Sequence, residues 1–249
     1  MTPYFQDDAV TIYHGDCREI VPTLGRFDLL LTDPPYGIAC GIDGKRTDER
    51  RKSKLGITDT GIKVYGKSAA PKTDYGFSDW DVVPLELPEI ESMILTSTKA
   101  IVWGGNYYAL PPCGGWLFWD KQNDGNCFAD GELAWNNLGC PVRIKRHLWN
   151  GMLRVGRETR LHPTQKPLAL MNWCIGLAGD VQTILDPFAG SGTTGRAAKD
   201  LGRKAVLIER EERYCEIAAR RMGQGVLDFG TANSLLDRSD PYNTATSGQ

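Results

Sequence analysis

Leu185-Asp186-Pro187-Phe188-Ala189-Gly190-Ser191-Gly192-Thr193-Thr194-Gly195 is the stretch of the chain that decides the fold. The apolar run 181–185 leads into it, and residues 193–201 behind it have the pattern of a helix. Its glycines form G-x-G-x-x-G, a spacing that lets the backbone approach a bound nucleotide closely. Glu209 ends the next apolar run, nineteen residues after Gly190, where a carboxylate accepts hydrogen bonds from ribose hydroxyls. The stretch therefore predicts a nucleotide-type crevice at the end of a parallel strand.

The residues around this loop narrow the choice of ligand. Arg196 and Ala197 stand where a phosphate-binding P-loop needs Lys and Ser or Thr, which argues against an ATPase. Asp186 would lie beside the pyrophosphate of a dinucleotide, and two negative charges there repel each other. A ligand with an adenosine half and a cationic amino-acid half avoids that conflict. S-adenosylmethionine is such a ligand, with its ribose at Glu209 and its ammonium group at the acidic loop.

Outward from this loop, strand and helix patterns alternate along the chain. Such alternation predicts an α/β fold with a mostly parallel sheet and helices on both faces. The expected strands are 9–13, 27–32, 100–103, 116–119, 132–135, 181–185 and 205–208, and the expected helices are 89–98, 167–177, 193–201 and 210–222.

A second loop, Asp33-Pro34-Pro35-Tyr36, follows the apolar strand 27–32. Open α/β sheets carry their chemistry at this carboxyl end of the strands. The two prolines have restricted φ angles and no N–H donors, so the loop presents acceptors, namely the Asp33 carboxylate and the Pro34 carbonyl. With the aromatic face of Tyr36, these acceptors suit a planar group with an exocyclic NH2, such as adenine or cytosine. A proline turn that merely caps a strand is the plainer interpretation.

Together the two loops resemble those of the amino-methylating DNA methyltransferases, which carry both D-P-P-Y and F-A-G-S-G-T-T. Two further segments are similar to motifs of that family, His162-Pro163-Thr164-Gln165-Lys166-Pro167 and His14-Gly15-Asp16. The catalytic loop comes first and the cofactor loop 153 residues later, as in the circularly permuted β group, and most like its phage and prophage adenine-specific (N6) members. The resemblance implies a Rossmann-like, S-adenosylmethionine-dependent methyltransferase fold with inserted recognition segments.

The resemblance also implies a role for each matching residue. Asp33 and the Pro34 carbonyl would hold the target amino group, and Tyr36 would stack on a base flipped out of the duplex, with Pro35 completing the catalytic loop. No metal is implied, and for Lys166 a solvent-facing position is the alternative. The expected cofactor-binding residues are Asp16, Asp33, Thr164, Lys166, Asp186, Phe188, Gly190, Gly192, Thr193 and Glu209.

Other activities are weighed against this prediction. Pro112-Cys113 resembles the nucleophile of cytosine-C5 methyltransferases, but the E-N-V segment of those enzymes is missing, so Cys113 is expected to be a plain loop residue. D-P-P-Y favours adenine N6, and cytosine N4 is the first alternative. An NAD-dependent oxidoreductase and a non-catalytic DNA-binding module are alternatives of other classes.

The charge of the chain is unevenly distributed. The 249 residues carry a net charge of -2, but segment 41–80 carries +3 and segment 143–160 carries +5. Solvated loops are the plainer interpretation of these two segments. Because both segments lie between the two chemical loops, we instead predict that they contact DNA. Trp103, Trp135 and Trp149 are expected in the core rather than against bases. The predicted DNA-binding residues are Arg143, Lys145, Arg146, Arg154, Arg157, Arg160, Lys45, Arg46, Arg50 and Arg51.

The remaining features predict a single domain over residues 1–229, with inserts at 41–80 and about 120–160 and a disordered tail at 230–249. No apolar run approaches the roughly 18 residues of a membrane span, and the first fifteen residues do not have the pattern of a secretory signal. Seven cysteines without a C-x-x-C pair favour neither disulfides nor zinc, which suggests a bacterial cytoplasm. Double-stranded DNA is the expected partner, and a cognate restriction endonuclease or a homodimer is possible.

Overall fold

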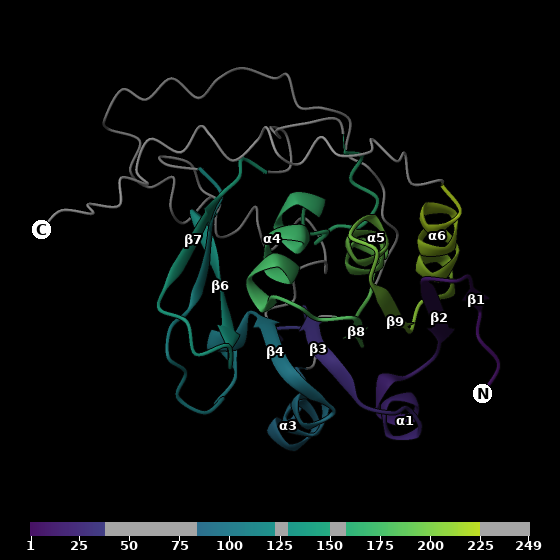
Figure 1. Cartoon of the computed structure of the whole chain (residues 1–249), viewed down its shortest axis with the longest axis horizontal. Helices are drawn as coiled ribbons and strands as arrows, with labels where there is room; N and C mark the ends of the chain where they lie inside the picture. The colour runs from purple at the N-terminus through teal and green to yellow at the C-terminus, as the bar shows by residue number, and fades with distance from the viewer. Residues whose placement is uncertain (38–83, 123–128, 150–157, 225–249) are drawn as a thin grey trace, which may run out of the picture.

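The computed structural model describes residues 1–37, 84–122, 129–149 and 158–224, which form one nine-stranded sheet with helices on both faces (Figure 1). The strand order across the sheet is β1-β2-β9-β8-β3-β4-β6-β5-β7. The strands are β1 (Phe5–Gln6), β2 (Val10–His14), β3 (Phe27–Thr32), β4 (Ser97–Trp103), β5 (Leu117–Asp120), β6 (Gly131–Asn136), β7 (Arg143–Arg146), β8 (Thr183–Asp186) and β9 (Lys204–Glu209).

Helices cover the two faces unequally. In Figure 1, α4, α5 and α6 lie on one face of the sheet and α1 and α3 lie on the other. Two short 3-10 turns, η1 (Val21–Thr23) and η2 (Gly105–Tyr107), connect elements at the ends of the sheet. The α-helices are α1 (Cys17–Ile20), α3 (Leu87–Leu95), α4 (Leu168–Ala178), α5 (Thr193–Asp200) and α6 (Glu212–Met222).

The middle of the sheet is parallel. Strands β2, β9, β8, β3 and β4 run in one direction, while β6 lies antiparallel to both β4 and β5. The pairing of Leu30 with Leu185 brings together two strands that lie far apart in the sequence. The predicted α/β fold with a mostly parallel sheet is confirmed, and β3 has the predicted bounds.

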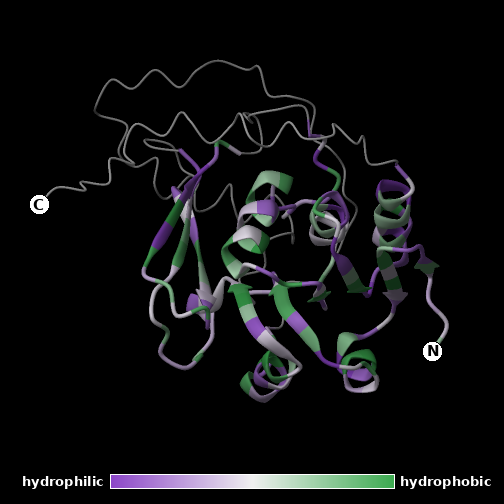
Figure 2. Ribbon diagram, viewed as in Figure 1, coloured by the Kyte–Doolittle hydropathy of each residue, from purple (hydrophilic) through white to green (hydrophobic). Residues whose placement is uncertain are grey.

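Two clusters of buried side chains, one on each face, form the core. Leu29 and Leu31 of β3 face the α4–α6 side, while Leu30 between them faces α1 and α3. A parallel sheet covered on both faces buries most residues of its central strands, so these strands are mainly apolar in sequence. Figure 2 shows this as the hydrophobic colour of the central strands and of the inward helix faces.

The glycines of the deciding stretch have separate structural tasks. Gly192 is the residue before α5, with φ +77°, and a Cβ there would lie 2.8 Å from the Cβ of Ala218 in α6. Gly195 lies within α5, where a Cβ would approach Leu207 Cδ1 of β9 to 2.5 Å. Gly192 therefore supplies the left-handed turn into the helix, and Gly195 the close packing of helix on strand.

The structure differs from the sequence-based expectation at the far edge of the sheet. Arg143–Arg146 forms β7, parallel to β5, so the interpretation of this part as a solvated loop is wrong. Trp103, Trp135 and Trp149 are buried, as expected, and Cys113 lies in a loop. Segment 41–80, residues 150–157 and the tail 230–249 lie outside the described residues. Among the described helices, none combines the length and apolar character that crossing a membrane requires.

Candidate active site

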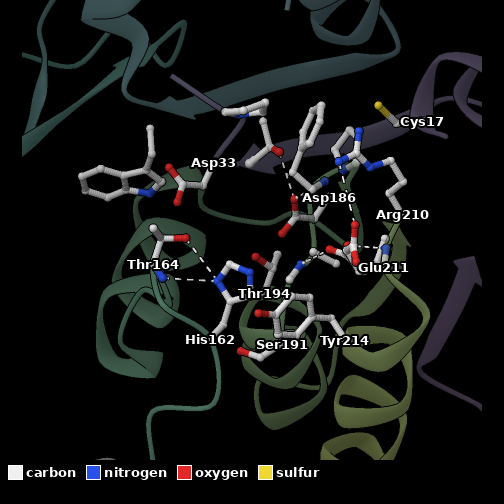
Figure 3. A pocket seen from close by; sticks show the side chains of 18 of the residues that line it. Cys17, Asp33, His162, Thr164, Asp186, Ser191, Thr194, Arg210, Glu211 and Tyr214 are labelled. Atoms are coloured by element: carbon white, nitrogen blue, oxygen red, sulfur yellow. Dashed lines mark hydrogen bonds and ion pairs between the residues drawn. The ribbon is translucent and has the colours of Figure 1, made fainter. Parts of the chain in front are cut away.

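The carboxyl ends of four parallel strands meet at one edge of the sheet and surround a cavity of about 410 Å³. Asp33 follows β3, Asp186 ends β8, Glu209 ends β9, and Asp16 follows β2 within two residues. All four carboxylates line the cavity, which is within the size range of cofactor pockets. Figure 3 shows Asp33, Asp186 and Glu211 around the space, with His162, Ser191 and Tyr214 on the opposite side.

Glu209 is held by the backbone of the glycine loop. Its Oε2 accepts a hydrogen bond from the Gly190 N–H at 2.8 Å, and its Oε1 accepts one from the Glu211 N–H at 2.8 Å. Burial raises the pKa of Glu209, and these N–H groups partly offset the rise. Because each carboxylate oxygen has two lone pairs, the side chain can still accept a hydrogen bond from a ligand hydroxyl.

Asp186 is the most deeply buried of the four carboxylates, with 3% of its surface exposed. Its Oδ1 accepts hydrogen bonds from Thr32 Oγ1 at 2.9 Å and from the Phe188 N–H at 3.1 Å. Burial raises the pKa of Asp186 to about 6, and its hydrogen bonds to neutral groups offset only part of the loss of water. A cationic group in the cavity would favour its ionised form.

Asp16 already has a cationic partner. Its carboxylate caps α1 by accepting from the Arg18 N–H at 2.8 Å, and the Arg18 guanidinium binds both of its oxygens. These hydrogen bonds lower the pKa of Asp16. An adenine amino group at this carboxylate would have to share it with Arg18, so the predicted contact stays a prediction.

The Asp-Pro-Pro-Tyr loop is bound into a cluster of charged and aromatic groups. The Tyr36 hydroxyl donates a hydrogen bond to Asp33 Oδ1, and Lys166 Nζ lies 2.5 Å from Asp33 Oδ2. Lys166 Nζ also lies 3.0 Å from Glu132 Oε2 of β6. With 7% of its side chain exposed, Lys166 is not solvent-facing. The structure pairs its ammonium with two protein carboxylates, whereas the sequence-based prediction assigned it to a cofactor carboxylate.

The charges in this cluster shift one another's titration. Burial raises the pKa of Asp33, and the negative charge of Glu132 adds to the rise that the Lys166 ammonium opposes. Burial alone would also raise the pKa of Glu132, but Lys166 and Lys121 outweigh it and lower the pKa to about 2. Despite its burial, Lys166 has a raised pKa because two carboxylates face it. All three groups are therefore held in place by one another's charge.

An aromatic ring already covers Tyr36. The ring of Tyr107 in η2 stacks on it at a centroid distance of 4.8 Å and an interplanar angle of 18°. The Tyr108 hydroxyl donates to the Pro35 carbonyl, and Gly104 leaves room for the Tyr36 ring, which a Cβ would strike. The loop is thus braced by η2, a contact that no sequence pattern indicated.

His162 forms a neutral wall of the cavity. Burial, together with the nearby cations Arg160 and Arg213, lowers its pKa to about 3. Its Nδ1 accepts from the Thr164 N–H at 3.3 Å, and its ring meets the edge of Tyr214 at 4.3 Å between centroids. Figure 3 shows the hydrogen bond that links His162 to Thr164. The H-P-T-Q-K-P segment therefore shapes the cavity through an uncharged imidazole.

The cavity gathers most, but not all, of the predicted site residues. Gly192 and Tyr36 do not line it, because Gly192 packs on α6 and Tyr36 is turned into the cluster with Tyr107; Pro34 is buried outside the lining. The predicted residues that do line it are Asp16, Asp33, Pro35, Thr164, Lys166, Asp186, Phe188, Gly190, Thr193 and Glu209.

The structure adds residues that sequence reasoning missed. His162 and Gln165 belong to a segment that was singled out, so their presence could have been inferred from it. Trp103 ends a parallel strand and could have been found by the same edge argument as Asp33. Glu132 does not line the cavity but pairs with Lys166 beside it; it lies on an antiparallel strand and carries no positional signal. Further lining residues are Cys17, Arg18, Glu89, Ser191, Thr194, Arg210 and Tyr214.

Four of the predicted DNA-binding residues lie within the described chain. Arg143, Lys145 and Arg146 belong to β7, and Arg146 Nε lies 3.3 Å from Asp120 Oδ2. Arg160 donates through Nε to the His162 carbonyl at 3.3 Å, so it also supports the cavity wall. Lys45, Arg46, Arg50, Arg51, Arg154 and Arg157 lie outside the described residues.

A family model described as "DNA methylase" (N6 and N4 methyltransferases) matches residues 93–220. Among curated relatives, the type II methyltransferase M.HinfI of Haemophilus influenzae is 28% identical over 266 residues, covering 89% of this chain and 70% of the relative. M.ScaI of Streptomyces caespitosus is 26% identical over 256 residues, covering 88% and 83%.

Solved structures share the fold. The M1.HpyAVI–SAM complex aligns with a TM-score of 0.51 at 22% identity, covering 86% of this chain and 100% of that one. The PvuII DNA methyltransferase (cytosine-N4-specific) aligns with a TM-score of 0.50 at 14% identity, covering 90% and 89%.

Proposed function

This chain belongs to the DNA methylase family of N6 and N4 amino-methyltransferases, and on that basis we propose that it methylates adenine N6 in double-stranded DNA. The cofactor is S-adenosylmethionine. The observation that carries the proposal is the meeting of the Asp-Pro-Pro-Tyr loop with the glycine loop at one cavity. The choice of adenine over cytosine rests on Asp33, because the resemblance associates D-P-P-Y with N6 methylation.

The residues around the cavity suit the chemistry of this cofactor. Glu209 would accept hydrogen bonds from the ribose hydroxyls, as it retains free lone pairs. Asp186 would face the ammonium group, whose positive charge would offset the cost of burying this carboxylate. Phe188 offers an apolar contact for the adenine ring. When bound, the cofactor supplies an electrophilic methyl group on a sulfonium sulfur.

Asp33 is the residue proposed to act on the target base. Its carboxylate would accept a hydrogen bond from the exocyclic NH2, which increases the electron density on that nitrogen as the new N–C bond forms. One proton must leave the nitrogen afterwards, and the Asp33 carboxylate is the protein base proposed to receive or relay it. The Pro34 carbonyl is proposed as the second acceptor. Holding the nitrogen in line for displacement is then the main contribution of the loop.

The target base must leave the duplex to reach this loop, at a cost of a few kcal/mol. Stacking on an aromatic side chain would return about 1–3 kcal/mol of it. Since Tyr107 covers Tyr36 in the structure, the base would have to displace Tyr107 or stack on the pair of rings from outside. Tyr107 is half exposed, which leaves it space to move.

Methylation of DNA with an isotope-labelled cofactor tests the proposal. Mixed-sequence duplex DNA is incubated with the protein and digested, and the nucleosides are identified by mass spectrometry. We expect labelled N6-methyl-2′-deoxyadenosine from the wild type and no product from Asp33→Ala, which should still bind the cofactor in calorimetry. Labelled N4-methyl-2′-deoxycytidine would overturn the adenine assignment, and methylation by Asp33→Ala would overturn the catalytic role.

A further inference from the structure

Glu132 is a partly buried carboxylate, 25% exposed, that lies beside the active-site cavity and to which the proposed chemistry gives no task. It lies on β6, an antiparallel strand outside the parallel edge where the other carboxylates meet. Its Oε2 lies 3.0 Å from Lys166 Nζ, and its Oε1 accepts a hydrogen bond from the Lys121 ammonium. A charge that is largely removed from water is costly unless it is paired. Glu132 is paired with two ammonium groups, Lys166 and Lys121, and the three charges form a cluster beside Asp33.

Lys166 stands between two acceptors that are not equivalent. Its Nζ lies 2.5 Å from Asp33 Oδ2, 3.0 Å from Glu132 Oε2 and 3.3 Å from the Tyr36 hydroxyl. The ring of Trp103 lies beneath it, with the centroid 5.7 Å from Nζ. The ammonium is therefore within ion-pair distance of both carboxylates and closer to Asp33.

This arrangement conflicts with the task proposed for Asp33. Each of its oxygens already has a close partner, Oδ1 the Tyr36 hydroxyl and Oδ2 the Lys166 ammonium. Although each oxygen keeps a second lone pair, the ammonium neutralises the negative charge that would attract the target amino group, so that group competes with Lys166 for the charge of Asp33. If the ammonium left Asp33 with no other partner, a charge 7% exposed would be unpaired, which is strongly unfavourable.

We propose that Glu132 is a positioning residue that takes over the Lys166 ammonium when the target amino group binds Asp33. The inference rests on the proposed function, because it assigns Asp33 to the target base. Since Glu132 is already within 3.0 Å of Nζ, a small side-chain rotation of Lys166 completes the exchange. The ammonium stays paired throughout, and Asp33 Oδ2 is released for the substrate.

Lys121 keeps Glu132 ready for this exchange. Its ammonium binds the other oxygen of Glu132 and lies 4.7 Å from the centroid of the Trp119 ring. Held from that side, the Glu132 carboxylate cannot turn away from Lys166 without losing an ion pair. The charged groups that interact with Asp33 are Lys166, Glu132 and, at the end of β8, Asp186, with Lys121 behind Glu132 and the Tyr36 hydroxyl beside Asp33.

The test is the variant Glu132→Gln, which preserves shape and removes the charge. We expect kcat to fall at least ~10-fold, because Lys166 remains on Asp33, while the Kd for S-adenosylmethionine changes less than ~2-fold. The control is Glu216→Gln, which removes an exposed carboxylate paired with Arg220 on α6 and should leave both quantities unchanged. A kcat of Glu132→Gln equal to that of the wild type would overturn the inference.

Two further measurements separate positioning from a structural role. In a Lys166→Met background the same Glu132→Gln change should no longer lower kcat, because the ammonium to be moved is absent; losses that multiply would overturn the inference. The acidic limb of the kcat profile should move to lower pH in Glu132→Gln, since removing this negative charge lowers the pKa of Asp33. If the acidic limb of the kcat profile stays at the same pH in Glu132→Gln, the inference is also overturned.

A charge-balanced double variant tests whether an unpaired Lys121 ammonium, rather than the missing Glu132 charge at Lys166, lowers kcat. Lys121→Met with Glu132→Gln removes one charge of each sign and leaves the net charge of the cluster unchanged. It should show the same loss of kcat as Glu132→Gln alone, which would exclude an unpaired Lys121 as the cause of that loss. If the wild type methylates no DNA, the proposed function itself is contradicted. If the wild type is active and the double variant is equally active, only the role of Glu132 is contradicted.

Discussion

Asp186 shows how a single buried carboxylate can couple ligand binding to pH. Its pKa is raised to about 6 by burial, and the neighbouring His162 does not titrate in this range because its own pKa is about 3. A cationic ligand favours the ionised form of Asp186, so below pH 6 binding must expel the proton that this carboxyl otherwise holds. Protonation in the folded state also means that the protein alone gains stability as pH falls through this pKa.

We therefore expect S-adenosylmethionine to bind about tenfold more weakly at pH 5 than at pH 7, the loss that linkage predicts when binding removes one proton from a carboxyl with a pKa of about 6. Calorimetric titrations at pH 5, 6 and 7 measure the effect. Asp186→Asn should bind more weakly than the wild type at pH 7, with little dependence on pH. A wild-type affinity that is the same at pH 5 and pH 7 would refute the role of Asp186.

At the residue scale, sequence motifs predicted which side chains meet but not which protein groups they pair with. Asp33, Asp186 and Glu209 each follow or end an apolar run, and parallel strands must bring such ends together. The pairing of Lys166 with Asp33 and Glu132 could not be predicted, because it depends on how β6 is oriented beside β4. The stack of Tyr107 on Tyr36 likewise depends on a short turn with no periodic pattern.

At the scale of single elements, two helical glycines have opposite surroundings. Gly176 lies exposed in α4, where a Cβ would have no atom within 4 Å, whereas a Cβ on Gly195 in α5 would meet Leu207 at 2.5 Å. The first glycine only lowers the stability of its helix, and the second permits α5 to pack on β9. The same residue type therefore weakens one element and enables the other.

Alanine at each position makes this contrast measurable. Gly176→Ala should increase the free energy of unfolding by about 0.5–1 kcal/mol through helix propensity. Gly195→Ala should decrease it by about 1–3 kcal/mol, because Leu207 and Val10 are buried and leave no space for a methyl group. Urea unfolding followed by tryptophan fluorescence compares the two, and a shift of both in the same direction would contradict the packing argument.

The elements themselves divide into those with and without a sequence signal. The central strands were predictable because burial on both faces makes them uniformly apolar, as in Phe27–Thr32. Strand β7 was not, because its sequence Arg-Ile-Lys-Arg lies at the sheet edge with Ile144 52% exposed. An edge strand needs neither apolar alternation nor helix cover, so composition alone made it look like a loop.

At the scale of the whole molecule, the segregated charge of the chain predicts how DNA approaches. Arg143, Lys145 and Arg146 lie on an outer strand of the sheet, while Arg26, Arg203 and Lys204 lie near the amino ends of β3 and β9, opposite the cavity. The first set lies on β7, which pairs with β5, and β5 pairs on its other side with β6, the strand of Glu132. We propose that the first set contacts phosphates and the second does not.

Fluorescence anisotropy with duplex DNA at salt concentrations from roughly 50 to 200 mM tests this division. Changing Arg143, Lys145 and Arg146 of β7 to alanine should weaken DNA binding. The slope of log K against log salt should become less steep by roughly 2–3, because each lost cation leaves one phosphate without a partner. Changing Arg26, Arg203 and Lys204 to alanine should leave the slope unaltered. Equal slopes for the wild type and the β7 variant would show that DNA binds elsewhere.

The pairing of β3 with β8 also constrains how the molecule is made. Leu29 and Leu30 are matched by Ile184 and Leu185, more than 150 residues later in the chain. During synthesis, β3 emerges with one edge unpaired and stays so until β8 has left the ribosome. Non-local pairing of this kind folds slowly and exposes an apolar edge on the way. A chain that ends before β8 therefore lacks the glycine loop and leaves one edge of β3 unpaired, so it has neither a finished site nor a protected sheet.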